Sequence, residues 1–143
     1  MAALLAFAAA PAQAGTGGAS TVASSQVNAG DGIVFSPMRW AGATWYGPGL
    51  YGNNTACGQV LRPNTVGVAH RSLPCGTAVK LAYRGRQIVT RVIDRGPYSE
   101  GNDWDLTLAA ARALRFDKVG ADMVGFAVSL DYARKSGAQR SAR

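Results

Sequence analysis

The chain has 143 residues, a length that fits one domain and excludes two of ordinary size. Only 16% of its residues are charged and 18 are glycine, a mixture typical of a turn-rich β protein rather than of a helical bundle. The net charge of +7 can attract nucleic acid, acidic lipid or anionic wall polymer, and its sign does not choose among them. No apolar stretch reaches the roughly 20 residues of a membrane-spanning helix, which excludes an integral helical membrane protein.

The N-terminus has the pattern of an export signal. Residues 4–10 are apolar, and Ala12 and Ala14 form the small-x-small pattern that signal peptidase accepts. We therefore expect a signal peptide at residues 1–14 and a secreted, extracytoplasmic protein. No basic residue precedes the apolar run, so an alanine-rich loop or a different start codon is the alternative reading. Neither cysteine lies at the cleavage site, so no lipid anchor is expected.

Residues 15–40 are rich in glycine, serine, alanine and asparagine and predict a flexible linker. Residues 33–35 are an apolar run that could dock on the domain, although Pro37 limits a strand there. We expect the folded domain to occupy residues 41–130. The basic residues that follow predict a disordered tail at 131–143.

Within the domain, short β-prone runs cover residues 44–46, 66–70, 79–83, 87–93 and 123–130. Arg84 and Gly85 predict a two-residue hairpin turn between the third and fourth runs. Leu106, Ala110 and Leu114 keep helical spacing, with Asp105 or Thr107 as the N-cap. The sum is an all-β fold of about six strands with one short α-helix, and closure into a small barrel would remove the sheet edges.

The chain has two cysteines, Cys57 and Cys75. An exported protein with an even number of cysteines usually pairs them, so we expect a disulfide between them. Two buried free thiols are the alternative. With one histidine and two distant cysteines, no metal site is expected.

Several common catalytic patterns are absent or fail in context. Residues 47–52 match G-x-G-x-x-G, but Pro48 removes a donor and no acid lies between Asp31 and Asp94, so dinucleotide binding is rejected. The sequence contains neither a nucleophile elbow nor a P-loop. What remains is a set of short polar blocks.

These blocks resemble, in the same order, the rare lipoprotein A (RlpA) family of double-psi β-barrels, which is related to expansin and barwin domains. The resemblance extends over about residues 41–130. The blocks are Ala43-Thr44-Trp45-Tyr46-Gly47, Thr55-Ala56-Cys57-Gly58-Gln59, Ala69-His70-Arg71-Ser72-Leu73-Pro74-Cys75-Gly76, Asp94-Arg95-Gly96-Pro97-Tyr98 and Asp105-Leu106-Thr107.

The resemblance implies a small six-stranded double-psi β-barrel that acts on bare peptidoglycan glycan strands as a lytic transglycosylase. That reaction needs one acid/base, because the sugar's own 6-hydroxyl closes a 1,6-anhydro ring. Three positions depart from the family: Gln59 replaces the usual Glu, Arg62 stands near an expected Asp, and the lipid-anchoring cysteine is absent. The resemblance also brings the loops of Cys57 and Cys75 together.

Asp94 and Asp105 are the two candidates for the catalytic acid. Asp94 ends a predicted strand, and its alternative role is a structural ion pair with Arg95 or Arg91. Asp105 matches the acid that related domains place before the helix, and its alternative role is a plain helix N-cap. If the two carboxyl groups are close, the pKa of one should rise, and that group becomes the acid.

The remaining candidates would bind or orient the substrate. His70 could position a sugar or tune a carboxylate, or it could be a hydrogen-bonded barrel histidine. One of Trp45 and Tyr46 must point inward, so at most one of them can stack on a sugar ring. The other substrate-binding candidates are Thr55, Gln59 and Tyr98.

Two classes of function stay open at this point: a lytic transglycosylase, and a non-enzymatic expansin-like module that binds or loosens wall polymer. Gln59 favours the second, whereas Asp94, Asp105, His70 and Thr55 favour the first. A nucleic-acid partner is not expected, because no recognisable motif accompanies the charge. We expect a monomer without a cofactor.

Overall fold

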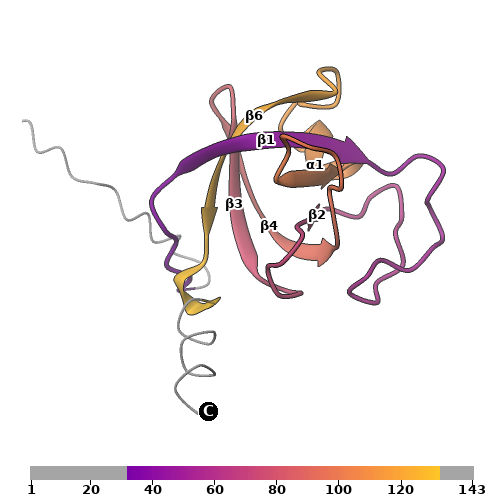
Figure 1. Cartoon of the computed structure of the whole chain (residues 1–143), viewed down its shortest axis with the longest axis horizontal. Coiled ribbons are helices and arrows are strands. Elements are labelled where there is room, and N and C mark those ends of the chain that lie inside the picture. Colours follow the sequence, from indigo (N-terminus) through magenta and orange to yellow (C-terminus); the bar gives the residue numbers. More distant parts are fainter. Residues whose placement is uncertain (1–31, 133–143) are drawn as a thin grey trace, which may run out of the picture.

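The computed structural model describes residues 32–132, which form a closed barrel with the strand order β1-β5-β2-β4-β3-β6 (Figure 1). The fold is therefore mostly β and six-stranded, as predicted. The elements are β1 (Arg39–Tyr46), β2 (Val68–Ala69), β3 (Ala78–Tyr83), β4 (Arg86–Asp94), β5 (Trp104–Thr107), α1 (Leu108–Ala113) and β6 (Ala121–Val128).

The barrel interior is filled by aliphatic and aromatic side chains from alternate strand positions. The largest fully buried ones include Trp104, Leu106, Leu81 and Phe116. Helix α1 buries Leu108, Ala110 and Ala111, and the two alanines pack in this core, so the small residues of the helix allow it to lie close to the barrel.

The hairpin between β3 and β4 has the predicted two-residue turn. Arg84 and Gly85 both adopt positive φ, 43° and 79°, as a type I′ turn requires. The paired residues Tyr83 and Arg86 close the turn. In Figure 1 this turn and the arrowhead of β4 point to opposite ends of the barrel.

One strand replaces part of the predicted helix. Trp104–Thr107 pair in parallel with β1 and in antiparallel with β2, so Asp105 lies in a strand and is not a helix N-cap. Thr107 is the N-cap, and its hydroxyl accepts hydrogen bonds from the backbone N–H groups of Ala110 at 3.2 Å and Gly67 at 3.1 Å.

The predicted linker at residues 15–40 was too long, because its last residues belong to the barrel. β1 begins at Arg39, and Phe35 is buried and pairs with Ser129. Burial of the Phe35 side chain against the barrel stabilises this segment, although Pro37 disfavours a strand there. The predicted signal peptide, residues 15–31 and most of the tail lie outside the described residues. Within residues 32–132, no helix is long and apolar enough to cross a membrane.

Candidate functional site

Two carboxylates meet on one row of the barrel. Ala69 in β2 pairs with Asp94 of β4 on one side and with Asp105 of β5 on the other, and Asp105 pairs in turn with Thr44 of β1. Paired residues on neighbouring strands point to the same face, and two strand spacings separate the acids by about 10 Å between Cα atoms. Ala69 therefore acts as a small spacer between two facing carboxyl groups.

The register irregularity between β2 and β4 helps to aim Asp94. Val68 pairs with Val92, whereas the next residue, Ala69, pairs with Asp94, so Ile93 is the extra residue of a β-bulge. Gly67 lies against Ile93, and a Cβ atom at Gly67 would overlap that side chain. Close packing at this bulge fixes the direction in which Asp94 leaves the strand.

Asp105 is half-buried between its two neighbouring strands. Burial raises the pKa of Asp105 above its usual range, and the nearby charge of Asp94 raises it as well. Thr44 opposes these effects, because its hydroxyl donates a hydrogen bond of 2.9 Å to Asp105 Oδ1 and lowers the pKa. The charge of Asp94 is therefore one of the causes of the raised pKa of Asp105.

Asp94 is held by backbone groups. Its Oδ1 accepts hydrogen bonds from the N–H of Ala56 at 2.9 Å and from the N–H of Arg95 at 2.8 Å. Within the described chain its carboxylate has no ion pair: the Arg95 guanidinium bonds carbonyl oxygens, and that of Arg91 bonds the carbonyl of Gly76. The alternative role of Asp94, a structural ion pair, is therefore not what the contacts show.

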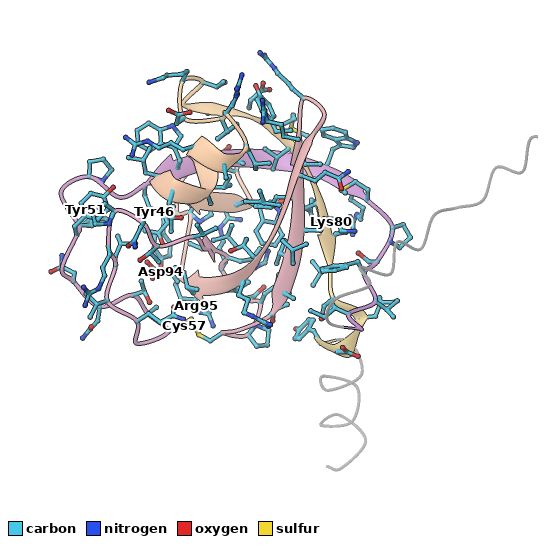
Figure 2. The ribbon with its side chains drawn as sticks, turned by 180° about the vertical axis from the view of Figure 1, so that it is seen from behind. Tyr46, Tyr51, Cys57, Lys80, Asp94 and Arg95 are labelled. Carbon is cyan, nitrogen blue, oxygen red and sulfur yellow. A yellow bond between two sulfur atoms is a disulfide. The ribbon has the colours of Figure 1, made fainter. Side chains whose placement is uncertain are left out.

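The two aromatic residues that end β1 separate as the strand alternation requires. Trp45 packs against the core, and Tyr46 lies on the face of Thr44 and of the carboxylates (Figure 2). Burial raises the pKa of the Tyr46 hydroxyl, and the charges of Asp94 and Asp105 raise it further. An interaction with the Asp94 side chain adds to this shift, although the buried Tyr46 hydroxyl forms no hydrogen bond of ordinary geometry with the described residues.

A loop fastened by the disulfide lies over Asp94. Cys57 and Cys75 are bonded, with their Cα atoms 5.7 Å apart, which confirms the predicted pairing. The N–H of Cys57 also donates to the carbonyl of Ile93 at 3.2 Å. Together with the bond from Ala56 to Asp94, these contacts hold the loop at the carboxyl end of β4.

Thr55 and Gln59 close a tight turn in this loop. The N–H of Thr55 donates to the Gln59 carbonyl at 2.7 Å, while the Gln59 side chain is exposed. The Thr55 hydroxyl is buried and has no partner among the described residues. Buried hydroxyls without partners are uncommon in folded proteins, and the site contains two of them, on Thr55 and Tyr46.

His70 follows β2 directly, and its contacts are structural. Its ring packs on Trp104 with 4.6 Å between centroids, and its Nδ1 accepts hydrogen bonds from the N–H groups of Ser72 at 3.2 Å and Leu73 at 3.1 Å. Burial lowers the pKa of His70. These contacts favour a neutral ring with its proton on Nε2, holding the turn in place.

Two arginines for which the sequence predicts no contact with loop carbonyl groups, Arg71 and Arg95, organise the loops around the site. Arg71 donates to the carbonyl oxygens of Pro97, Ser99 and Asn102. Arg95 donates to those of His70 and Leu73. The sequence does contain a signal for this role, because Arg71 directly follows the candidate His70 and Arg95 directly follows the candidate Asp94.

The last predicted residue, Tyr98, is 85% exposed beyond this network. The structure therefore brings together Asp94, Asp105, Tyr46 and Thr55, and it leaves Tyr98 at the surface. Thr44 is a site residue for which the sequence analysis predicts no role, although strand alternation with Tyr46 places it on the same face. Within residues 32–132, no group of three or more metal-ligating side chains occurs.

Known proteins similar to this chain agree with the barrel. The chain is 43% identical over 84 residues to a probable endolytic peptidoglycan transglycosylase RlpA of Synechocystis, which covers 57% of this chain and 26% of that protein. It is 42% identical over 90 residues to the endolytic peptidoglycan transglycosylase RlpA of Yersinia pestis, covering 59% and 25%. The chain thus spans about a quarter of the length of these relatives.

Among solved structures, the expansin of Clavibacter michiganensis superposes with a TM-score of 0.52 at 24% identity, covering 64% of this chain and 50% of that one. A mutant of the same expansin in complex with cellohexaose gives 0.53 at 20% identity, with the same coverage. These similarities confirm the double-psi β-barrel fold. The model of the family described as lytic transglycolase matches residues 41–125, more than half of the chain, and the chain therefore belongs to that family.

Proposed function

We propose that this protein cleaves peptidoglycan glycan strands as a lytic transglycosylase and leaves 1,6-anhydro ends. The observation that carries the proposal is the row of two carboxyl groups on either side of Ala69, one of which has a raised pKa. Membership of the lytic transglycolase family and the activity for which the relatives are named support it.

Asp105 is the general acid in this proposal. A raised pKa keeps its carboxyl group protonated to higher pH than an ordinary aspartate, so it can donate a proton to the glycosidic oxygen. The bond from that oxygen to C1 then breaks, and positive charge develops at C1. The 6-hydroxyl of the same sugar attacks C1, and its proton returns to Asp105, so the reaction consumes no water.

Asp94 acts as the charged partner. Two backbone N–H groups fix its Oδ1, and its carboxylate faces the same row as Asp105. A fixed negative charge at this place stabilises the positive charge that develops at C1. It also supports the assignment of Asp105 as the acid, because it disfavours a second negative charge nearby.

Polar groups around the acids would receive the sugar. The hydroxyls of Tyr46 and Thr55 are buried and without a hydrogen-bond partner among the described residues, so they would bond sugar hydroxyl or acetamido groups once a small shift of their side chains exposes them. Tyr98, exposed on the following loop, offers a ring face for stacking. His70 positions the turn between β2 and the disulfide rather than touching the sugar.

The test is product analysis on purified strands without stem peptides. Wild-type protein should release 1,6-anhydro products, and Asp105→Asn and Asp94→Asn should each lower the rate by about 10²- to 10⁴-fold while keeping the fold. Asp103→Asn is the matched control, because Asp103 is an exposed acid close in sequence that bonds Arg71 at 3.5 Å. Equal rates for wild type and Asp105→Asn would refute the acid assignment.

The binding-only alternative makes a different prediction in the same assay. Gln59 stands where the family usually has Glu, and an amide cannot donate and recover a proton. If wild type binds strands and releases nothing, the protein is a wall-binding module, and Gln59→Glu becomes the variant to test for gained activity. Extracytoplasmic action is part of the proposal, and it is supported by the disulfide.

A further inference from the structure

A hollow lies on the opposite side of the barrel from the two carboxylates. Its volume is about 300 Å³, and its lining includes Phe35, Met38, Trp40, Lys80, Ala82 and Gln87. Figure 2 shows Lys80 across the barrel from Tyr46 and Asp94. None of the residues proposed above for catalysis or sugar binding lines this hollow.

The strand register explains the shape of the hollow. Trp40 pairs with Gly125, Gly125 with Ala82, and Ala82 with Gln87, so one row crosses four strands on the outer face. The two middle residues are the smallest available, and a Cβ atom on Gly125 would come within 3.1 Å of Met38 Sδ. The bottom of the hollow is therefore formed by small residues, with the Trp40 indole ring at one side and the Gln87 amide at the other.

Lys80 is the unusual residue of this hollow. It is only 5% exposed, and its ammonium group lies 4.9 Å from the centre of the Phe35 ring. Among the described residues it makes no hydrogen bond and no ion pair. The Lys80 nitrogen is not among the fully buried atoms without a partner, so the ammonium group reaches the hollow and can pair there with an anion.

Trp40 adds a second binding feature. It is 63% exposed although it is the largest side chain in the row. A flat ring with an exposed face suits the C–H face of a sugar, and the Gln87 amide can both donate to and accept from sugar hydroxyl groups. An acidic peptide would pair with Lys80 but would not offer that flat C–H face.

We propose that this hollow is a second saccharide subsite that recognises a carboxylate-bearing sugar through Trp40, Gln87 and Lys80. The inference rests on the proposed function for its source of ligand: in peptidoglycan, the lactyl carboxylate of a muramic acid unit is free only where the stem peptide has been removed. The subsite therefore distinguishes bare strands from peptide-bearing ones, in which the same carboxyl group is an uncharged amide.

The test is a titration that reports on this hollow alone. The indole N–H signal of Trp40, assigned in the NMR spectrum with Trp40→Phe, is followed in an Asp94→Asn background, in which cleavage of the probe is slowed by at least about 10²-fold. One probe is a tetrasaccharide of alternating N-acetylglucosamine and N-acetylmuramic acid with free lactyl carboxylates. The other is the same tetrasaccharide with both carboxyl groups converted to methyl amides.

The carboxylate probe should bind at least about tenfold more tightly than the amide probe, because a hydrogen-bonded charge pair is lost with the amide. Lys80→Met, which keeps the length and apolar stem of the side chain, should abolish that difference. Lys118→Met is the matched control, because it removes the same charge from a side chain that is 89% exposed. Trp40→Ala, at an exposed position that does not threaten the fold, should weaken both probes when binding is followed by calorimetry.

Three results would overturn the inference: equal affinity for the two probes, equal losses in Lys80→Met and Lys118→Met, or a Trp40 signal that moves with protein concentration alone, which indicates a second copy. Cleavage is measured separately on wild-type protein. Lys80-dependent binding without cleavage refutes the proposed function and leaves the subsite standing, whereas cleavage with equal affinity for both probes refutes only the subsite.

Discussion

The hydrogen bond from Thr44 to Asp105 gives a quantitative test of the acid assignment. The Thr44 hydroxyl stabilises the ionised form of Asp105, so Thr44→Val should raise the pKa of that carboxyl group further. A general acid works only while it is protonated, and the alkaline limb of the pH–rate profile follows its pKa. The limb should therefore move to higher pH in the variant.

The size of the shift follows from the strength of the bond. A hydrogen bond to a charged group contributes about 1.5–3 kcal/mol, and about 1.4 kcal/mol corresponds to one pKa unit. Asp105 is only half-buried, so water replaces part of the lost bond, and we expect the lower end of the range. The limb should move upward by about one pH unit.

The assay is the release of 1,6-anhydro product from bare strands, measured as kcat/KM between pH 4 and pH 9. Thr90→Val is the matched control, because Thr90 is a buried threonine of β4 that does not bond either acid. If the alkaline limb of Thr44→Val stays in place or moves to lower pH, the assignment of Asp105 as the acid is refuted. If Thr90→Val shows an equal shift, the shift is due to general destabilisation and not to the lost hydrogen bond.

Three further predictions concern stability. The raised pKa of Asp105 means that the folded state binds more protons than the unfolded chain, so the free energy of unfolding falls as pH rises from the unfolded pKa of 3.8 through the folded pKa. Asp105→Asn should therefore melt a few °C above wild type at pH 7. A difference in Tm that persists at pH 3 would contradict this. Replacing Cys57 and Cys75 by serine removes a disulfide between residues 18 positions apart. The free energy of unfolding should fall by about 3 kcal/mol and Tm by on the order of 15 °C. An unchanged Tm in calorimetry would contradict this prediction. Gly42→Ala places a Cβ atom against the backbone carbonyl of Gly101, whereas in Gly67→Ala the obstacle is the flexible side chain of Ile93; Gly42→Ala should therefore be the more destabilising of the two in urea unfolding, and the reverse order would be evidence against the packing described.

Local chemistry predicted some elements of the fold well. The Arg84-Gly85 turn and the helix cap depend on a few neighbouring residues; the turn formed as predicted, and Thr107 is the one of the two predicted N-cap candidates that caps the helix. The strand β5 was missed, because Leu106 fits the helical spacing of Ala110 and Leu114. Pairing with β1 and β2 decides its conformation, and a single sequence does not display those partners.

The candidate site shows the same division. The two acids and the disulfide could be predicted from residue type and block order. Their relation across Ala69 could not, because it depends on the bulge at Ile93 and on a register that joins segments far apart in the chain. Nothing in the sequence indicates the hollow around Lys80, because Lys80 occupies an ordinary polar position in an alternating strand.

The shortest strand of the barrel has a consequence for how activity can be lost. β2 consists of Val68 and Ala69 alone, and it is the only described strand that joins β4 to β5. Opening of this two-residue seam would break the barrel wall and separate the acids in one event, while the β3–β4 hairpin and β6 stay paired. Inactivation on heating should then precede global melting, and a bulkier residue at position 69 would impair a protein whose two acids are both intact.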